Sequence, residues 1–476
     1  MRPLIGREEQ KRLLLSALNS NKPELIALIG RRRVGKTFLV RQTYEKRIRF
    51  ELTGLQTGGL REQLQNFALT FARAFPDFDT SGVPENWLVA FDQLARALEA
   101  ATGPERPVIF LDELPWLATR RSGFLRALGY FWNSWASKQS VVVVICGSAA
   151  SWMIDKVVND KGGLHNRITR LLHLDPFTLH ETELLCKAQG VRLPRYQLLQ
   201  LYMVMGGIPM YLEQLEQGLS AAQQIQAICF ARNGYLRREF NRLFASLFAD
   251  YERHVTVIRA LAEKRIGMPR KVLASLLPQA DGGSLNRTLD ELIESGFVTV
   301  YSSYRKRRRD QLYRLTDPYS LFYLTYIERL GQSNGANFTQ LSSLPAWRSW
   351  SGYAFETVCL QHVPQIKRAL GIAGIATIAG SFYTPATDAG PGAQIDLLIE
   401  RADQTIHLCE AKFTQRALRL TTQLQQQFEQ KSTVFHRETA TPHHLFHTLI
   451  TTHPPSGMPA QYNIDQVITL DDLFAA

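Results

Sequence analysis

The sequence predicts a multidomain α/β protein, with a parallel sheet near the N-terminus and a second α/β domain near the C-terminus. Continuous apolar runs at residues 24–30, 107–113 and 141–147 are typical of strands buried on both faces of a parallel sheet. Helical stretches such as Leu60–Phe75 and Trp87–Ala101 separate these runs, which is the alternation of an α/β fold. Because 476 residues exceed a single core, we expect two or three domains.

The bulk composition is that of a globular protein. Hydrophobic residues make up 45% of the chain and charged residues 21%, which excludes a largely disordered or fibrous chain. The five cysteines form no CxxC pair, so we expect neither a disulfide framework nor a thiolate zinc site. No apolar segment has the length of a signal peptide core or a membrane span. We therefore expect a cytoplasmic protein without a membrane partner.

The positive charge is unevenly distributed. The net charge is +12, yet residues 341–476 hold 9 Lys and Arg against 11 Asp and Glu, so the first 340 residues hold 46 against 32. A basic surplus of this size favours a polyanionic partner. We expect nucleic acid, and DNA rather than RNA.

The middle of the chain changes from helical to mixed character. Residues 177–238 are mostly helical and read as a lid. From about Asp250, three helices at 252–264, 269–277 and 284–295 precede two short strands, and this order is typical of a winged helix. A polar stretch rich in Gly, Ser and Asn then predicts a linker. The predicted boundaries are 1–240 for the first α/β domain with its lid, 241–330 for the winged helix, 331–346 for the linker and 347–476 for the last domain.

Residues 30–37, GRRRVGKT, match the phosphate-binding loop GxxxxGK[ST] between a strand and a helix. Gly30 and Gly35, with Arg33 between them, let the backbone curve so that its N–H groups surround a phosphate. Lys36 reaches the β and γ oxygens and Thr37 holds Mg²⁺. This loop predicts ATP binding.

An acidic pair supports that prediction. The strand 108–111 ends on Asp112 and Glu113, where Asp112 completes the Mg²⁺ shell and Glu113 polarises the attacking water. Ser148, at the end of the next strand, stands where the AAA+-type ATPases that these motifs resemble carry a polar sensor of the γ-phosphate. A small polar residue at a strand end is also an ordinary turn former, so both interpretations stay open for Ser148.

Taken together, the motifs resemble those of the archaeal and bacterial signal-transduction ATPases of the AAA+/STAND class. The resemblance runs over about residues 1–215 through GREE, GRRRVGKT, FLDELPWL, CGSAASWM, RITR, LDPF and GGIP. It implies that Gly6–Glu8 lie near the adenine, that Pro209 lies on a lid facing the nucleotide, and that Arg167 acts as an arginine finger. It also implies that ATP works as a conformational switch, with a homo-oligomer or a regulatory protein as a further partner.

The winged-helix segment allows two interpretations. Its hairpin tip, residues 304–309 (YRKRRR), is a dense positive cluster beside Tyr301 and Tyr313, as expected for a wing that grips phosphates. The expected recognition helix, residues 284–295, is less suited to contact with DNA. It carries Asp290, Glu291 and Glu294, leaving Ser284, Asn286 and Arg287 for bases. The segment either contacts DNA or forms a structural arm with a solvated loop.

The C-terminal region predicts a second catalytic site. Residues 394–400 and 405–413 read as a hairpin in which alternation places Glu410 and Lys412 on one face and lets Asp396 point to the same side. Converging carboxylates hold one or two Mg²⁺ ions, or Mn²⁺, and the lysine positions water for attack on a phosphodiester. Glu356, on a preceding amphipathic helix, adds a further carboxylate.

Asp396, then Glu410-x-Lys412, resembles the PD-(D/E)XK nuclease fold, with Ile395 where the family often has proline. The resemblance implies a restriction-endonuclease-like domain. The leading hypothesis is an ATP-switched, Mg²⁺-dependent nuclease. The alternatives are a non-cleaving, ATP-dependent DNA-binding or signalling regulator with an inactive nuclease-like domain, and a switch that senses a protein partner.

Overall fold

The computed structural model describes residues 3–78, 82–101, 105–119, 121–159, 161–248, 250–264, 266–277, 282–301, 304, 311–330, 337–386, 388 and 390–476. The chain forms two compact units. The first comprises Met1–Asp175 with Glu294–Gly296, and the second comprises Pro176–Ile293 with Phe297–Ala476.

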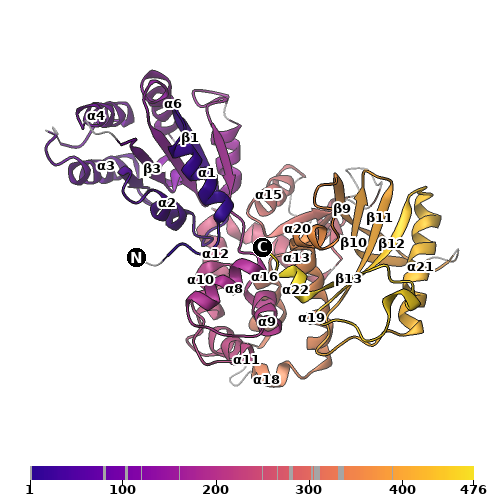
Figure 1. Ribbon diagram of the computed structural model, residues 1–476. Helices are drawn as coiled ribbons and strands as arrows, with labels where there is room; N and C mark the ends of the chain where they lie inside the picture. The colour runs from indigo at the N-terminus through magenta and orange to yellow at the C-terminus, as the bar shows by residue number, and fades with distance from the viewer. Residues whose placement is uncertain are drawn as a thin grey trace. The chain divides into compact units, whose positions relative to one another are not determined.

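The first unit is built on a five-stranded sheet in which all neighbouring strands are parallel, with helices on both of its faces (Figure 1). The strand order is β2-β3-β4-β1-β5. The predicted parallel sheet is confirmed, since every residue of β1, β3 and β4 is buried. The elements are α1 (Glu8–Leu18), β1 (Glu24–Ile29), α2 (Lys36–Tyr44), β2 (Ile48–Thr53), α3 (Leu60–Ala74), α4 (Trp87–Ala100), β3 (Val108–Asp112), α5 (Leu114–Leu117), α6 (Phe124–Ser134), η1 (Ala136–Lys138), β4 (Val142–Gly147), α7 (Ala150–Met153), η2 (Ile154–Val158) and β5 (Arg170–His173).

Aromatic side chains fill the core on one face of this sheet. Phe67 and Phe71 of α3, Trp87 and Phe91 of α4 and Phe124 of α6 belong to one buried cluster with alternate residues of β1, β3 and β4. The Trp87 and Phe124 rings meet edge to face at 4.7 Å between centroids. Burial of each such ring contributes about 2–3 kcal/mol. The sheet is therefore a rigid support for the loops that follow its strands.

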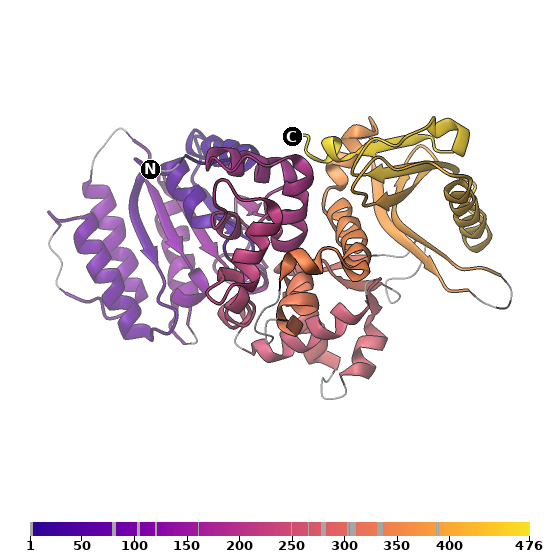
Figure 2. The same ribbon diagram turned by 90° about the horizontal axis from the view of Figure 1, so that it is seen from below.

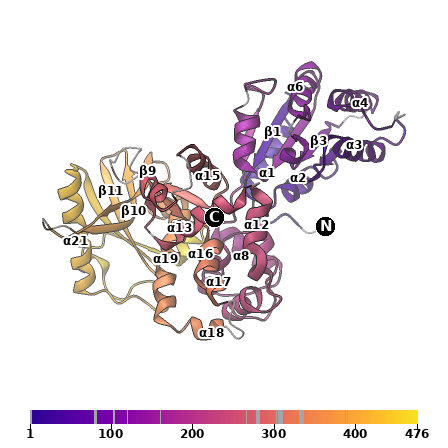
Figure 3. The same ribbon diagram turned by 180° about the vertical axis from the view of Figure 1, so that it is seen from behind.

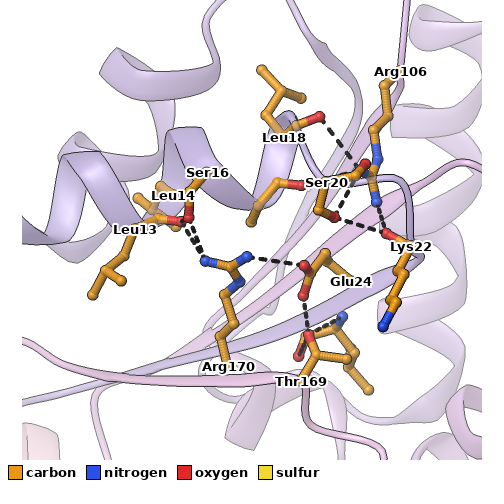
Figure 4. A network of polar contacts seen from close by, with 12 residues as sticks. Leu13, Leu14, Ser16, Leu18, Ser20, Lys22, Glu24, Arg106, Thr169 and Arg170 are labelled. Carbon is orange, nitrogen blue, oxygen red and sulfur yellow. Dashed lines mark hydrogen bonds and ion pairs between the residues drawn. The ribbon is translucent and has the colours of Figure 1, made fainter.

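A polar network closes the edge of the sheet where β1 begins (Figure 4). Arg170 donates to the Leu13 carbonyl at 3.0 Å and to Glu24 at 3.1 Å. Arg106 donates to carbonyl groups of Ala17, Leu18, Ser20, Lys22 and Val141. Burial would raise the pKa of Glu24, but hydrogen bonds from Arg170 and Thr169 outweigh it and lower that pKa. The network fixes the connection from α1 to β1 at the end of the strand opposite the phosphate-binding loop.

The second unit begins with helices and a small sheet. Its first helices are α8 (Leu179–Ala188), α9 (Arg195–Met205), α10 (Pro209–Leu212), α11 (Ala221–Ile225), η3 (Gln226–Phe230), η4 (Tyr235–Arg238) and α12 (Glu239–Leu247). A three-stranded sheet, order β6-β8-β7, follows. The elements of this segment are α13 (Tyr251–Glu263), β6 (Met268–Pro269), α14 (Arg270–Leu276), α15 (Gly282–Glu294), β7 (Val298–Tyr301) and β8 (Leu312–Leu315).

A mixed five-stranded sheet, order β13-β12-β11-β10-β9, ends the second unit (Figure 2). Strands β9, β10 and β11 pair antiparallel, whereas β11, β12 and β13 pair parallel. The elements are α16 (Pro318–Phe322), η6 (Tyr323–Ile327), α17 (Glu328–Leu330), α18 (Phe338–Leu341), α19 (Pro345–Gln361), α20 (Val363–Ala369), β9 (Thr377–Thr384), β10 (Ala393–Arg401), β11 (Thr405–Lys412), α21 (Thr422–Thr439), β12 (His444–Thr451), η7 (Pro459–Tyr462), β13 (Gln466–Thr469) and α22 (Leu470–Leu473).

The helical segment after β5 packs on the C-terminal part of the second unit. His362 accepts a hydrogen bond from the Leu179 backbone at 3.0 Å, and burial lowers the pKa of His362 to about 4, which keeps the ring neutral. Arg195 of α9 bridges Glu183 and Asp471 of α22 at 3.0 and 2.8 Å. The compact division therefore falls after Asp175 and not near residue 240, where the sequence led us to expect it.

The predicted linker contains regular structure. α18 lies within it, and α19 begins at Pro345 because proline fits the first turn of a helix. Phe338 and Trp347, on these two helices, are buried and meet at 5.0 Å. Among the described residues no helix is both long enough and apolar enough to cross a membrane.

Candidate functional site

The loop after β1 has the backbone that phosphate binding requires. Gly30, Arg33 and Gly35 all have positive φ, at 146°, 73° and 94°. A Cβ on Gly30 would lie 2.4 Å from the Leu174 carbonyl oxygen, so glycine is needed there for both conformation and space. α2 then starts at Lys36, which directs the N-terminus of a helix at the loop.

The Lys36 side chain is buried against the backbone of the phosphate-binding loop. Its Nζ donates to the carbonyls of Gly30 at 2.7 Å and Arg31 at 3.0 Å. Burial lowers the pKa of Lys36, whereas the carboxylates of Glu113 and Asp112 act in the opposite direction. The carbonyl groups at the start of the loop are thus directed at one buried ammonium group.

Thr37 and Asp112, the two residues expected to hold Mg²⁺, are in contact. The Thr37 hydroxyl donates to Asp112 Oδ2 at 2.7 Å, which joins the start of α2 to the end of β3. Asp112 is buried, and its other oxygen accepts the Glu113 backbone N–H at 2.9 Å. A hydroxyl beside a fixed carboxylate matches the oxygen ligands of Mg²⁺. These two residues would hold the ion, and the ion would neutralise charge on the phosphates.

Glu113 is held by the residue predicted as a sensor. Glu113 Oε2 accepts the Ser148 hydroxyl at 2.8 Å and the Ser148 backbone N–H at 3.3 Å. Glu113 follows β3 with φ 48°, an uncommon conformation that turns its side chain toward the end of β4. Ser148 therefore contacts the predicted catalytic base, a position from which it can control the orientation of that base.

Within one chain, the structure does not bring Arg167 to the phosphate-binding loop, residues 30–37. Thr169 donates its backbone N–H to the Leu25 carbonyl at the start of β1, so the exposed Arg167 belongs to the opposite edge of the sheet. Pro209 begins α10 in the second unit. A finger role for Arg167 in a second copy, and a nucleotide contact for Pro209, stay predictions.

The acidic residues of the C-terminal sheet converge as the hairpin predicted. Asp396 of β10 lies one step beyond the pair Leu397–Cys409, which sets it opposite Glu410 of β11. Asp396 Oδ2 accepts the Ala411 backbone N–H at 3.3 Å. Lys412 donates to Glu410 Oε1 at 2.7 Å. Two carboxylates and a lysine therefore occupy one face of neighbouring strands.

The ionisation of this cluster differs from carboxylate to carboxylate. Burial, followed by the nearby Glu410, raises the pKa of Asp396 to about 6. Burial would also raise the pKa of Glu410, but Lys431 and Lys412 outweigh it and lower that pKa. Burial would lower the pKa of Lys412, but Glu410 outweighs it and raises that pKa, so the lysine is a cation and not a base.

Glu356 has a different partner from the one expected. It lies on α19 and pairs with the buried Arg314 of β8 at 3.5 Å. Among the described residues no three His, Cys, Asp or Glu side chains are grouped to hold a metal ion, so Glu356 does not complete a cage with Asp396 and Glu410. Burial, followed by Asp396, raises the pKa of Glu356 to about 7.

Sequence reasoning missed two cations at this site, Lys431 and Arg314. Lys431 of α21 contacts Glu410 Oε2. The spacing of Leu424, Phe428, Lys431 and Phe435 puts this lysine on the buried face of α21, and that pattern is visible in the sequence. Nothing comparable marks Arg314, because its partner lies 42 residues away on another element.

The predicted wing lies partly outside the described residues. Arg305, Lys306, Arg307, Arg308 and Arg309 fall among the undescribed positions. Tyr304 at its base is buried and donates to Glu400 at 3.1 Å, and its ring lies 5.0 Å from the Phe435 ring, centroid to centroid. The expectation that Tyr304 helps to grip phosphates is therefore wrong, because the side chain fills the core of the C-terminal sheet.

Polar residues of the expected recognition helix, α15, already have partners. Glu291 pairs with the buried His254 at 2.7 Å and with Arg287 at 3.0 Å. Ser284 accepts from Arg253 at 2.9 Å, and Asn286 accepts from Arg270. If these side chains contacted bases, their present hydrogen bonds and ion pairs would have to break. The structure therefore favours a structural role for much of α15 over direct contact with DNA bases.

Comparison with known proteins assigns the N-terminal half of the chain. Residues 4–215 match the family model described as an ATPase domain predominantly from Archaea. The chain carries an archaeal-type, nucleotide-binding ATPase domain. A relative from Methanocaldococcus jannaschii, described as an uncharacterized protein, is 24% identical over 371 residues, which cover 76% of this chain and 78% of the relative.

Several solved structures are similar to parts of this chain. A Walker-type ATPase of Pyrococcus abyssi is 18% identical and covers 68% of this chain and 99% of its own, with a TM-score of 0.48. The ORC2 protein of Aeropyrum pernix, in ADPNP and ADP complexes, is 16% identical and covers 72% of this chain and 97% of its own, with a TM-score of 0.44. A STAND protein of Pyrococcus horikoshii is 14% identical and covers 79% of this chain and 52% of its own, with a TM-score of 0.30.

Proposed function

We propose that the chain is an ATP-dependent switch that controls metal-dependent cleavage of nucleic acid. The observation that carries the proposal is the convergence of Asp396, Glu410 and Lys412 on one face of β10 and β11. The same chain carries the residues expected of a nucleotide site, with Lys36 held by the loop carbonyls and Thr37 hydrogen-bonded to Asp112. A switch and an effector are therefore combined in one polypeptide.

In the ATPase half, the residues have separate tasks. The backbone of residues 30–37 and Lys36 bind the phosphates, and Glu113 orients the attacking water. Ser148 holds Glu113 by two hydrogen bonds, so hydrolysis depends on whether Ser148 keeps or releases it. Such a contact gives the ATPase a way to couple hydrolysis to a conformational change.

In the C-terminal half, the donor chemistry suits a divalent ion. Mg²⁺ is usually bound through one or two carboxylates, with substrate phosphate and water completing the shell. Asp396 and Glu410 supply such a pair, and the ion would stabilise charge on the phosphodiester when bound. The Lys412 ammonium, held beside Glu410, positions water and stabilises the negative charge of the transition state.

The topology of the second unit supports the same proposal. A sheet with three antiparallel and then parallel strands, preceded by α19 and crossed by α21, suits a PD-(D/E)XK nuclease-like domain. The order α13-β6-α14-α15-β7-β8 suits a winged helix. We propose that DNA is contacted by the positive wing residues 305–309. We also propose that the protein works in a reducing cytoplasm, where the five free, buried cysteines stay reduced.

The test is cleavage by purified protein. Wild type is incubated with plasmid, linear DNA and RNA, with and without ATP, in Mg²⁺ or Mn²⁺. Asp396→Ala and Glu410→Ala should abolish cleavage, and Lys412→Ala should lower the rate about a hundredfold. Glu438→Ala, on an exposed position of α21, is the matched control and should cut like wild type. Wild type that cuts none of the three substrates with either metal would contradict the proposal.

One observation favours a second candidate, a non-cleaving regulator. Both oxygens of Glu410 are occupied by lysines, Lys412 on Oε1 and Lys431 on Oε2. A carboxylate neutralised in this way serves structure as well as catalysis. For the regulator, the same assay predicts no cleavage by wild type, with nucleic-acid binding that changes between ATP and ADP.

A further inference from the structure

We propose that the cleft between the three-stranded sheet and α19 binds an unpaired nucleic-acid strand and leads it to the acidic site. The cleft has a volume of about 1130 Å³. Its inner wall includes Glu356, and Gln394, which donates to Asp396 Oδ1 at 3.4 Å. The inference rests on the proposed function, because it names the form of the substrate for that same site.

One face of α19 forms a wall of the cleft. The lining residues Arg348, Ser349, Gly352, Tyr353 and Glu356 recur every three or four positions, which is the period of one helical face. The exposed guanidinium of Arg348 lies two turns before Glu356. A phosphate held at Arg348 therefore lies along the same wall as the carboxylate near the acidic site.

The other walls supply a cation and an aromatic ring. Lys264, just after α13, is exposed and lines the cleft beside the exposed carboxylate of Glu263, with Gly267 and Pro269 of the neighbouring turn and strand. Tyr383 of β9 pairs in register with Gln394 of β10 and is 39% exposed. A tyrosine ring open to solvent, on the strand beside Asp396, is a stacking surface for a base.

Size and chemistry together select a single strand. Cavities of about 300–1,000 Å³ hold drug-sized ligands, so this cleft accommodates a few nucleotides and not a duplex. Cations beside an exposed aromatic ring are the common chemistry of single-strand binding, because every base has a π-face and every linkage a charge. Figure 3 shows α13, α19, β9 and β10, which carry much of this surface, in the second unit.

Binding of labelled oligo-dT and oligo-U, measured by fluorescence anisotropy in EDTA against a blunt duplex, tests the proposal without cleavage. Wild type should bind at least one single strand more tightly than the duplex, and the two oligonucleotides distinguish DNA from RNA. Tyr383→Ala should weaken single-strand binding about tenfold, whereas Tyr383→Phe, which keeps the ring, should bind like wild type. Arg348→Ala should weaken binding and lower the salt slope by about 0.7.

A variant that fills the cleft tests the proposal independently. A Cβ on Gly352 would meet no atom within 4 Å, so Gly352→Phe should fold and should block the cleft. Tyr130→Ala in the first unit and Arg368→Ala on α20 are exposed controls that should bind like wild type. Equal binding of duplex and single strands, or wild-type binding by Tyr383→Ala and Gly352→Phe, would overturn the inference.

The two proposals fail separately. If Asp396→Ala abolishes cleavage while the cleft variants bind like wild type, the proposed function stands and the cleft inference is wrong. If the cleft variants lose single-strand binding while wild type cuts nothing, the cleft inference stands and the cleavage proposal is wrong.

Discussion

At the residue scale, the nucleotide site depends on a few side chains with separable roles. Lys36 is buried among loop carbonyls, and Glu113 is held by Ser148. Lys36→Ala should reduce ATP affinity by at least tenfold, since it removes the charge aimed at the β and γ phosphates. Glu113→Gln should bind ATP normally and hydrolyse it about a hundredfold more slowly. Calorimetry and a phosphate-release assay separate the two effects, and unchanged affinity in Lys36→Ala would contradict the loop assignment.

The acidic cluster predicts a stability change with pH. The pKa of Glu356 is about 7 in the folded chain, above its ordinary 4.5, so the folded state holds this proton where the unfolded state has lost it. The folded state therefore loses stability as pH rises from about 4.5 to 7. Glu356→Gln should remove this loss, so its melting temperature relative to wild type should rise across that range.

Thermal melts at pH 5 and pH 7.5 measure this difference. Glu438→Gln, an exposed carboxylate on α21, should show the same offset from wild type at both values. An offset for Glu356→Gln that is equal at pH 5 and pH 7.5 would contradict a half-buried carboxyl that keeps its proton in the folded chain.

The role of a residue could be predicted from the sequence where its partners belong to a short motif, and not where its partner is distant in the sequence. Gly30, Lys36, Thr37 and Asp112 were predictable because the loop and the strand end recur with fixed chemistry. Glu356 was assigned as a metal ligand, but the structure pairs it with Arg314. That pairing joins α19 to β8 and leaves no periodic trace in the sequence.

At the element scale, the hairpin β7–β8 is anchored to the C-terminal sheet. Tyr304 is buried against Phe435 and hydrogen-bonded to Glu400. Tyr304→Ala should lower the free energy of unfolding of the second unit by about 3 kcal/mol, because it leaves a cavity. Tyr304→Phe should cost only about 1 kcal/mol, the value of the hydrogen bond.

Urea unfolding of the three proteins provides the measurement, with Tyr130→Ala as the exposed aromatic control. A cost for Tyr304→Ala no greater than for Tyr130→Ala would show that the hairpin is not anchored there.

The positive segment between β7 and β8, residues 305–309, is expected to bind DNA phosphates. Replacing Arg305, Lys306, Arg307, Arg308 and Arg309 with neutral residues should weaken duplex DNA binding and lower the salt slope by about 0.9 for each phosphate that is no longer neutralised. Sequence preference should barely change, because phosphate contacts carry no base information. Binding and salt dependence that both survive would favour the structural-arm alternative.

Elements were predictable where hydrophobic periodicity is strong, as in β1, β3 and β4. Residues 337–346 were assigned to a linker by their polar composition, yet they include α18 and the start of α19. Phe338 and Trp347 decided the outcome, since two buried aromatic rings in contact order a segment whose other residues are polar.

At the scale of the whole molecule, the chain divides after Asp175, so the helices that follow β5 belong with the C-terminal part. The sequence placed this boundary near residue 240 because residues 177–238 read as a helical lid and the pattern of a winged helix starts only near Asp250. Contacts such as Arg195–Asp471 join residues 276 positions apart, and no local pattern reveals them. The helical segment and the acidic site therefore belong to the same compact unit.

If the nucleotide controls the acidic site, single-turnover cleavage must differ with and without ATP. Wild type and Lys36→Ala are compared on one nucleic-acid substrate in Mg²⁺, with Asp396→Ala as the uncut baseline. Typical allosteric coupling changes an equilibrium by about 5–150-fold. We expect ATP to change the wild-type cleavage rate by about tenfold and to leave the Lys36→Ala rate unchanged. A wild-type rate that is the same with and without ATP would contradict control of the acidic site by the nucleotide.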